Sequence, residues 1–134
     1  MQSLKKHILA ALFVFFGSML GGALRFGLQM ATVAYAGVLI LPIVTVLINM
    51  LASTALGVLI AITRRPNPPS AAVNKSAVRR LFWGTGFCGG FSSFSLFTVD
   101  WLALAAYPLW SLVYIVLSIG LALAGFSMAS RKEL

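Results

Sequence analysis

Small, hydroxyl and aromatic residues are concentrated between Gly86 and Asp100, in the stretch GFCGGFSSFSLFTVD, within an otherwise apolar chain. Free backbone carbonyls cannot face lipid, so a membrane helix interrupted by glycines must face protein or an aqueous cavity. In that setting the carbonyls can hold a hard cation, which prefers oxygen ligands. The alternative for Gly86, Gly89 and Gly90 is close packing between helices, which small residues allow.

Hydroxyl residues follow these glycines at four positions within seven residues: Ser92, Ser93, Ser95 and Thr98. Any one of them can hydrogen-bond its own helix backbone, but four together favour a polar route. Phe94 and Phe97 are three residues apart and share a helix face, where most such pairs are ordinary packing. Because the rim of an aromatic ring carries partial positive charge, the pair can also face an anion.

Other polar residues stand alone in apolar stretches and each has two interpretations. Asn49 is either a hydrogen-bonding link between helices or a donor that lines a pore. Arg25 either extends to the membrane interface or draws anions into a vestibule. Tyr114 and Ser118 fall on one helix face, which packing alone could explain.

The composition indicates an integral membrane protein. Of 134 residues, 60% are hydrophobic and 9% are charged, whereas about a quarter of the residues in soluble proteins are charged. A chain of this length holds about four helical spans of roughly 20 residues each and little else. Cys88 is the single cysteine, which excludes an intrachain disulfide. With only two acidic residues and no nucleophile beside a base, an enzyme is not expected.

Hydrophobicity predicts an all-α membrane protein with one domain, residues 1–134, and four membrane spans. The spans cover about residues 8–30, 38–63, 80–104 and 109–130. The N-terminal segment has the basic start and apolar core of a secretory signal. We interpret it as a retained first span, because its apolar run continues to Leu24 and three further apolar segments follow.

The predicted loop between the second and third spans, about residues 64–79, contains three prolines that exclude a helix around them. Nine of the ten Lys and Arg residues flank one side of the predicted spans: Lys5, Lys6, Arg64, Arg65, Lys75, Arg79, Arg80, Arg131 and Lys132. The positive-inside rule therefore predicts a protein of the cell membrane with both termini and this loop in the cytoplasm. We interpret the net charge of +8 as a topology signal and expect no nucleic-acid partner.

The four apolar segments resemble, in order, the spans of the Fluc (CrcB-type) fluoride channels. GFCGGFSSFSLF resembles the third-span signature G-x-x-G-G-x-T-T-F-S-T-F, with serines at both positions of the T-T pair. GGALRF resembles the glycine-rich first span that ends in an arginine, and TVLINMLASTALG resembles the second-span pattern G-T-x-x-V-N-x-x-G. YIVLS matches a Tyr-x-x-x-Ser pattern of the fourth span. Val44, Ala52 and Asp100 depart from the usual Gly, Gly and Glu.

The resemblance implies an antiparallel dimer of four-helix subunits, in which the third helix is broken. It implies a structural sodium ion at the dimer centre, bound by the backbone carbonyls of Gly89 and Ser92 of each subunit. It also favours the pore interpretation of Asn49. The implied fluoride pathway contains Asn49, Phe94, Ser95, Phe97, Thr98, Tyr114 and Ser118. The expected function is passive export of fluoride, which lowers its cytoplasmic concentration and toxicity.

Two other functions are compatible with the length and hydrophobicity. A small multidrug-type transporter has four spans, but it needs a buried carboxylate in the first span to exchange protons for a cation. The first predicted span has no carboxylate. A non-conducting membrane assembly subunit would have no use for the polar third span.

The charge distribution also bears on the dimer. An antiparallel homodimer requires one sequence to insert in both orientations, whereas the basic residues here strongly favour one orientation. We therefore predict a heterodimer with a related subunit of inverted orientation. The alternative is a homodimer that forms despite the bias.

Overall fold

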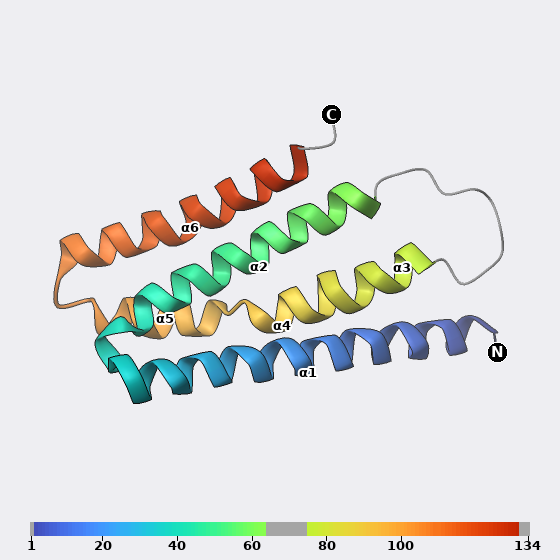
Figure 1. The fold of residues 1–134 in the computed structure, drawn as a ribbon, viewed down its shortest axis with the longest axis horizontal. Helices are drawn as coiled ribbons and strands as arrows, with labels where there is room; N and C mark the ends of the chain where they lie inside the picture. The colour runs from blue at the N-terminus through green and yellow to red at the C-terminus, as the bar shows by residue number, and fades with distance from the viewer. Residues whose placement is uncertain (1, 64–74, 132–134) are drawn as a thin grey trace.

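The computed structural model describes residues 2–63 and 75–131, and within these ranges every regular element is helical. This confirms the predicted all-helical class. The elements follow one another from the first helix to the last (Figure 1): α1 (Gln2–Ala36), η1 (Val38–Ile40), α2 (Leu41–Thr63), α3 (Lys75–Arg79), η2 (Arg80–Cys88), α4 (Gly89–Phe91), α5 (Phe94–Ala103) and α6 (Pro108–Arg131). The short η1 is a 3₁₀-helix and η2 is a π-helix.

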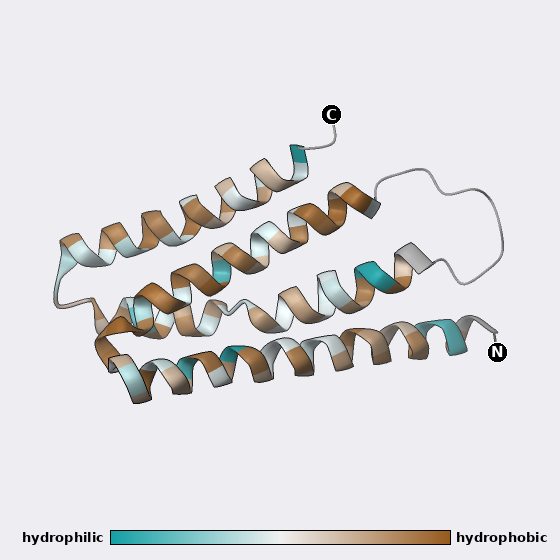
Figure 2. Ribbon diagram, in the orientation of Figure 1, coloured by the Kyte–Doolittle hydropathy of each residue, from teal (hydrophilic) through white to brown (hydrophobic). Residues whose placement is uncertain are grey.

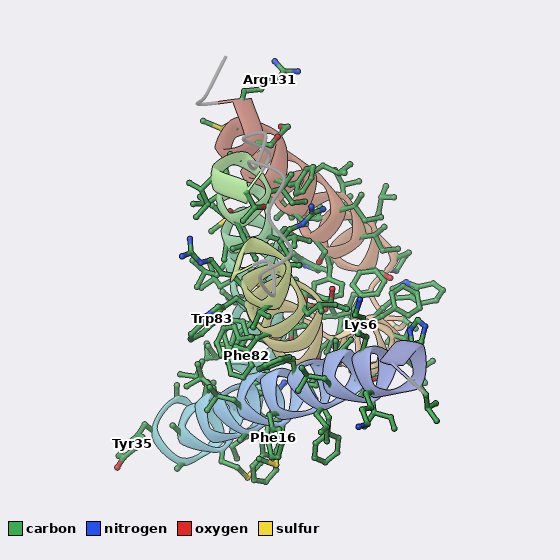
Figure 3. All side chains as sticks on the ribbon, turned by 90° about the vertical axis from the view of Figure 1, so that its right-hand side faces the viewer. Lys6, Phe16, Tyr35, Phe82, Trp83 and Arg131 are labelled. Carbon is green, nitrogen blue, oxygen red and sulfur yellow. The ribbon has the colours of Figure 1, made fainter. Side chains whose placement is uncertain are left out.

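Three helical segments are long and apolar enough to cross a membrane: Leu4–Ala36, Val38–Thr63 and Pro108–Arg131. They correspond to the first, second and fourth predicted spans, and hydrophobic residues are spread along all three (Figure 2). Their outer surfaces carry exposed apolar side chains, such as Phe16, which points away from the other helices (Figure 3). Such surfaces suit a lipid environment, because lipid gives no penalty for exposed hydrocarbon.

The predicted third span, about residues 80–104, is divided among η2, α4 and α5. Most of the loop predicted before it, residues 64–74, lies outside the described residues. Residues 75–79 of that predicted loop are helical instead and lead directly into η2. The reason is that the three prolines lie upstream, where they do not restrict the backbone of α3.

The helices pack in two pairs that run side by side (Figure 1). The second helix, α2, packs along α6, and the segment η2–α4 packs along α1. A small buried cluster of Ile48, Ala52, Cys88 and Phe91 joins α2 to this segment. The two described ends of the chain lie at the same end of the bundle.

Close contact between α1 and the segment η2–α4 depends on glycine. A Cβ atom added to Gly21 would collide with the carbonyl oxygen of Phe87, and one added to Gly90 would collide with the carbonyl oxygen of Ser18. Four such residues form a continuous contact, which we call the glycine seam: Gly17, Gly21, Gly86 and Gly90. Small residues let membrane helices approach until their backbones touch. The close-packing interpretation therefore describes Gly86 and Gly90, whereas a Cβ on Gly89 would meet no atom within 4 Å.

Candidate functional site

Two extended residues, Ser92 and Ser93, interrupt the helical segment between α4 and α5, and we call them the break. Their φ/ψ values are −72°/157° and −149°/118°. In an uninterrupted α-helix the N–H of Ser93 would donate to the carbonyl of Gly89, and the N–H of Leu96 to that of Ser92. Instead, the N–H of Ser93 donates to Oδ1 of Asn49 at 2.9 Å, and the N–H of Leu96 to Oγ of Ser93 at 3.2 Å. Two side chains thus take the donors that these two carbonyls would have had.

Side chains from two other helices hold the break. Asn49 of α2 accepts from the Ser93 N–H, and its Nδ2 lies 3.4 Å from the Ser93 carbonyl oxygen. Arg25 of α1 donates from Nη1 to the Ser92 carbonyl oxygen at 3.1 Å. Both side chains are half-buried. Asn49 therefore has the role of a link between helices, and Arg25 touches the backbone that was expected to bind sodium.

An open hollow of about 350 Å³ lies beside the break. Its polar lining comes from α2, the break and α6: Asn49, Ser53, Ser92, Ser93 and Ser118. Phe94 and Phe97 add two aromatic rings, whose centroids are 5.6 Å apart. We call this space the break hollow. Its lining combines amide, hydroxyl and aromatic groups without a carboxylate.

The break hollow brings together four of the seven residues predicted for the ion pathway: Asn49, Phe94, Phe97 and Ser118. Ser95 lies next to it through a 3.1 Å contact between its Oγ and that of Ser93. The hydroxyl of Thr98 donates to the carbonyl of Ser95 at 2.7 Å, which is the backbone bond that serine and threonine often make in helices.

Tyr114 does not line the break hollow but packs on Phe97, which does. Its ring stacks on that of Phe97, with centroids 5.3 Å apart and planes 17° from parallel. Its hydroxyl donates to Oδ2 of Asp100 at 3.2 Å, and both residues are buried. The bond between Tyr114 and Asp100 therefore joins α6 to α5, the helix that follows the break.

The sequence did not single out Ser53, and it did not reveal the bonds made by Ser93 and Asp100. Ser53 lines the break hollow, and a signal for it exists, because it follows Asn49 by four residues and so shares its helix face. Ser93 was noted as a hydroxyl residue, but its bonds to Asn49 and Leu96 were not foreseen. The Asp100–Tyr114 bond has no local signal, because the chain reverses between α5 and α6.

The chain is similar to known proteins along most of its length. The model of a family described as CrcB-like protein, Camphor Resistance (CrcB), matches residues 12–130. A Fluoride-specific ion channel FluC of Methylobacterium sp. (strain 4-46) is 37% identical over 95 residues, which cover 69% of this chain and 68% of that protein. The protein of the same name from Methylobacterium nodulans (strain LMG 21967 / CNCM I-2342 / ORS 2060) is 35% identical over 127 residues, or 87% and 95% of the two chains.

A third relative of that name, from Erythrobacter litoralis (strain HTCC2594), is 31% identical over 120 residues, or 86% of this chain and 85% of that protein. These relatives are ion channels, which confirms that the chain is not an enzyme. Together with the three long apolar helices, they support a multi-pass protein of a membrane. The resemblance seen in the sequence is confirmed, and the chain belongs to the CrcB-like family of ion channels.

Proposed function

We propose that this chain is a subunit of a fluoride-specific channel that exports fluoride passively and lowers its cytoplasmic concentration. The observation that carries the proposal is the lining of the break hollow, which presents hydroxyl, amide and aromatic groups without a carboxylate. Fluoride is small and strongly hydrated, so a pore must replace its water with N–H and O–H donors. The names of the relatives support fluoride as the ion.

Ser118 and Asn49 are the best-placed donors for the ion. Ser118 lines the break hollow one helical turn beyond Tyr114, and its buried hydroxyl carries a proton that it can donate to an ion. Asn49 directs one amide hydrogen toward the Ser93 carbonyl, and its second amide hydrogen is available to a ligand. Phe94 and Phe97 would present the positive rims of their rings beside these donors.

Ser95, Thr98 and Tyr114 complete the proposed route at a greater distance from the hollow. The hydroxyls of Thr98 and Tyr114 already donate to a carbonyl and a carboxylate, respectively. They can therefore serve an ion only when those bonds exchange. Arg25 bonds the break, and its vestibule role stays a prediction.

A structural sodium ion forms part of the proposal. The carbonyls of Gly89 and Ser92 suit a hard cation, because their helical donors are bonded elsewhere. Gly89 and Ser92 also line one open space together, beside Thr85 and Cys88. Sodium would supply positive charge to carbonyls at the C-terminal end of the helical segment Lys75–Phe91, where a cation is favoured.

The remaining parts of the proposal are that η2, α4 and α5 together form the third of four membrane spans, and that two subunits form an antiparallel dimer. The ring of Phe94 is 78% exposed although it lines the break hollow, so a second subunit would be needed to enclose an ion there. The basic residues favour one orientation, with both termini cytoplasmic, so the second subunit is a related chain of inverted orientation.

Efflux of fluoride from liposomes tests the channel directly. We expect flux of fluoride without a proton gradient, negligible flux of chloride, and no transport of a cationic dye. Replacing Phe94 or Phe97 with Ile keeps a bulky apolar side chain but removes the aromatic ring, so flux should fall at least tenfold while assembly is retained. Chloride flux comparable to that of fluoride, or dye transport coupled to protons, would contradict the proposal. Unchanged flux in both variants would return the two rings to a packing role.

Orientation is tested by expressing the chain alone with a reporter tag at its C terminus. We expect nearly all tags in the cytoplasm and fluoride flux only after a related, inverted subunit is added. An even distribution of tags between the two sides, together with flux from the chain alone, would show a homodimer instead.

A further inference from the structure

The glycine seam places the side chain of Arg25 at the break. Gly17, Gly21 and Arg25 are spaced four residues apart, so they lie on one face of α1. The two glycines press that face against η2 and α4, with Gly17 at Phe82 and Gly21 at Phe87. Arg25 is one turn further along the same face, and its guanidinium therefore arrives at the break.

The surroundings of this guanidinium are unusual for a positive charge within a helical bundle. Nη1 donates to the Ser92 carbonyl oxygen at 3.1 Å, and Nε is buried with no partner in the described part of the chain. Asp100, the one acidic residue in the described ranges, bonds Tyr114. A charge inside a membrane protein is costly unless it is paired. Here the compensation comes from backbone carbonyl dipoles at the C-terminal end of the segment Lys75–Phe91.

We propose that Arg25 is a tethered cation of the break, whose guanidinium holds the Ser92 carbonyl in place and shares that oxygen with the sodium ion. This inference rests on the sodium site of the proposed function and deepens it. A carbonyl oxygen has two lone pairs, so it can accept a hydrogen bond and contact a metal ion together. Two positive charges next to one oxygen repel each other. Arg25 therefore fixes the position of a sodium ligand and at the same time weakens sodium binding.

The test compares two substitutions of Arg25 with a matched control. Arg25→Gln keeps a donor but removes the charge, and Arg25→Lys keeps the charge but loses the planar fork. Arg80→Gln removes the same charge from an exposed position at the start of η2. Thermal unfolding of the purified assembly is measured over a range of sodium chloride concentrations, with choline chloride added to keep ionic strength constant. Hydrogen exchange of the amides in residues 92–96 is measured in sodium-free buffer.

We expect sodium to stabilise Arg25→Gln at a half-saturating concentration about tenfold lower than in the wild type, because the repulsion is gone. Arg25→Lys and Arg80→Gln should keep the wild-type value. The amides of residues 92–96 should exchange faster in both Arg25 variants, because the Ser92 carbonyl has lost its fork-shaped partner. If Arg25→Gln does not fold, Arg25→Lys still tests whether the guanidinium holds the Ser92 carbonyl. In that variant the amides of residues 92–96 should exchange faster, while the half-saturating sodium concentration stays at the wild-type value.

An unchanged or higher half-saturating sodium concentration in Arg25→Gln would show that Arg25 and sodium do not share the Ser92 carbonyl oxygen. A wild-type melting temperature that does not change with sodium would show the same. If the amides of residues 92–96 exchange as slowly in both Arg25 variants as in the wild type, Arg25 does not hold the Ser92 carbonyl in place. Fluoride flux of the wild type in saturating sodium is measured separately. If sodium stabilises the protein as expected but no fluoride flux is seen, the proposed channel function is contradicted while the role of Arg25 is still supported.

Discussion

The helical segment before the break and the helix after it are held by different forces. Before the break, η2 and α4 lie against α1, and their backbones touch through the glycine seam. After the break, α5 is held by few hydrogen bonds to other helices: the N–H of Ser93, just before α5, donates to Asn49, and the Tyr114 hydroxyl donates to Asp100. Much of its surface is uncovered, since Phe94 is 78% and Leu102 74% exposed.

The difference teaches how one chain can combine a fixed site with an open one. Backbone contact leaves no room for added volume, so the segment before the break has a single position along α1. Polar bonds near the ends of α5 fix its direction but leave its outer face uncovered, where the proposed second subunit would pack. The break lies between the tightly packed segment η2–α4 and the largely uncovered helix α5. This position suits a site that two subunits would share.

The largest expected effect comes from filling the glycine seam. Gly21→Ala should lower the free energy of unfolding by about 3 kcal/mol, because its Cβ would collide with the Phe87 carbonyl and neither backbone can yield cheaply. The neighbouring Gly22→Ala is the control, since its Cβ would meet only the Gly90 carbonyl oxygen at 3.9 Å. Reversible unfolding in detergent compares the two. Equal stability of both variants would contradict backbone contact along α1.

A smaller effect is expected where polar bonds replace steric contact. Asn49→Leu should lower the free energy of unfolding by about 2 kcal/mol, because the partly buried N–H of Ser93 loses its acceptor. Hydrogen exchange should speed up at residues 93–96 and stay unchanged at residues 80–88, which the seam holds. Ser53→Ala is the control, because it lines the same hollow from the same helix. Faster exchange on both sides of the break would remove the distinction between the two regions.

The smallest effect is expected at the far end of α5. Tyr114→Phe removes the hydroxyl bonded to Asp100 but keeps the ring that stacks on Phe97, so the loss should be about 1 kcal/mol, the low end of the cost of leaving a buried acceptor without its donor. Tyr107→Phe, at an exposed ring, is the control. Unfolding of the two variants in the same detergent measures the difference. A loss as large as that of Gly21→Ala would mean that α5 is also rigidly anchored.

The sequence predicts helices and their order well, because a run of apolar residues is a local property. It does not show where a helix ends, because α1 runs from Gln2 to Ala36 and extends past both ends of the predicted membrane span, about residues 8–30. The neighbours Gly89 and Gly90 show the limit at the site. Gly90 touches Ser18 whereas Gly89 faces open space, and which of them does so depends on how the helix is rotated against α1.

Asn49 shows the same limit for polar groups. Its residue type and spacing allowed either a link between helices or a pore donor. The structure gives it the link, through a backbone N–H that lies 44 residues further along the chain, and also places it in the break hollow. A pattern within one helix cannot reveal a partner that only the packing of two helices brings near.

The length of α1 has a consequence for the surrounding bilayer. Its 35 residues extend about 52 Å at roughly 1.5 Å per residue. The hydrocarbon core of a bilayer is only about 30 Å thick, and the whole bilayer with its headgroups about 40–45 Å. With a moderate tilt, α1 therefore reaches through both headgroup layers, with exposed Lys5 and Lys6 in one and the 92% exposed ring of Tyr35 in the other. A membrane of different thickness would change this tilt, and α1 would carry the change through the seam to the break.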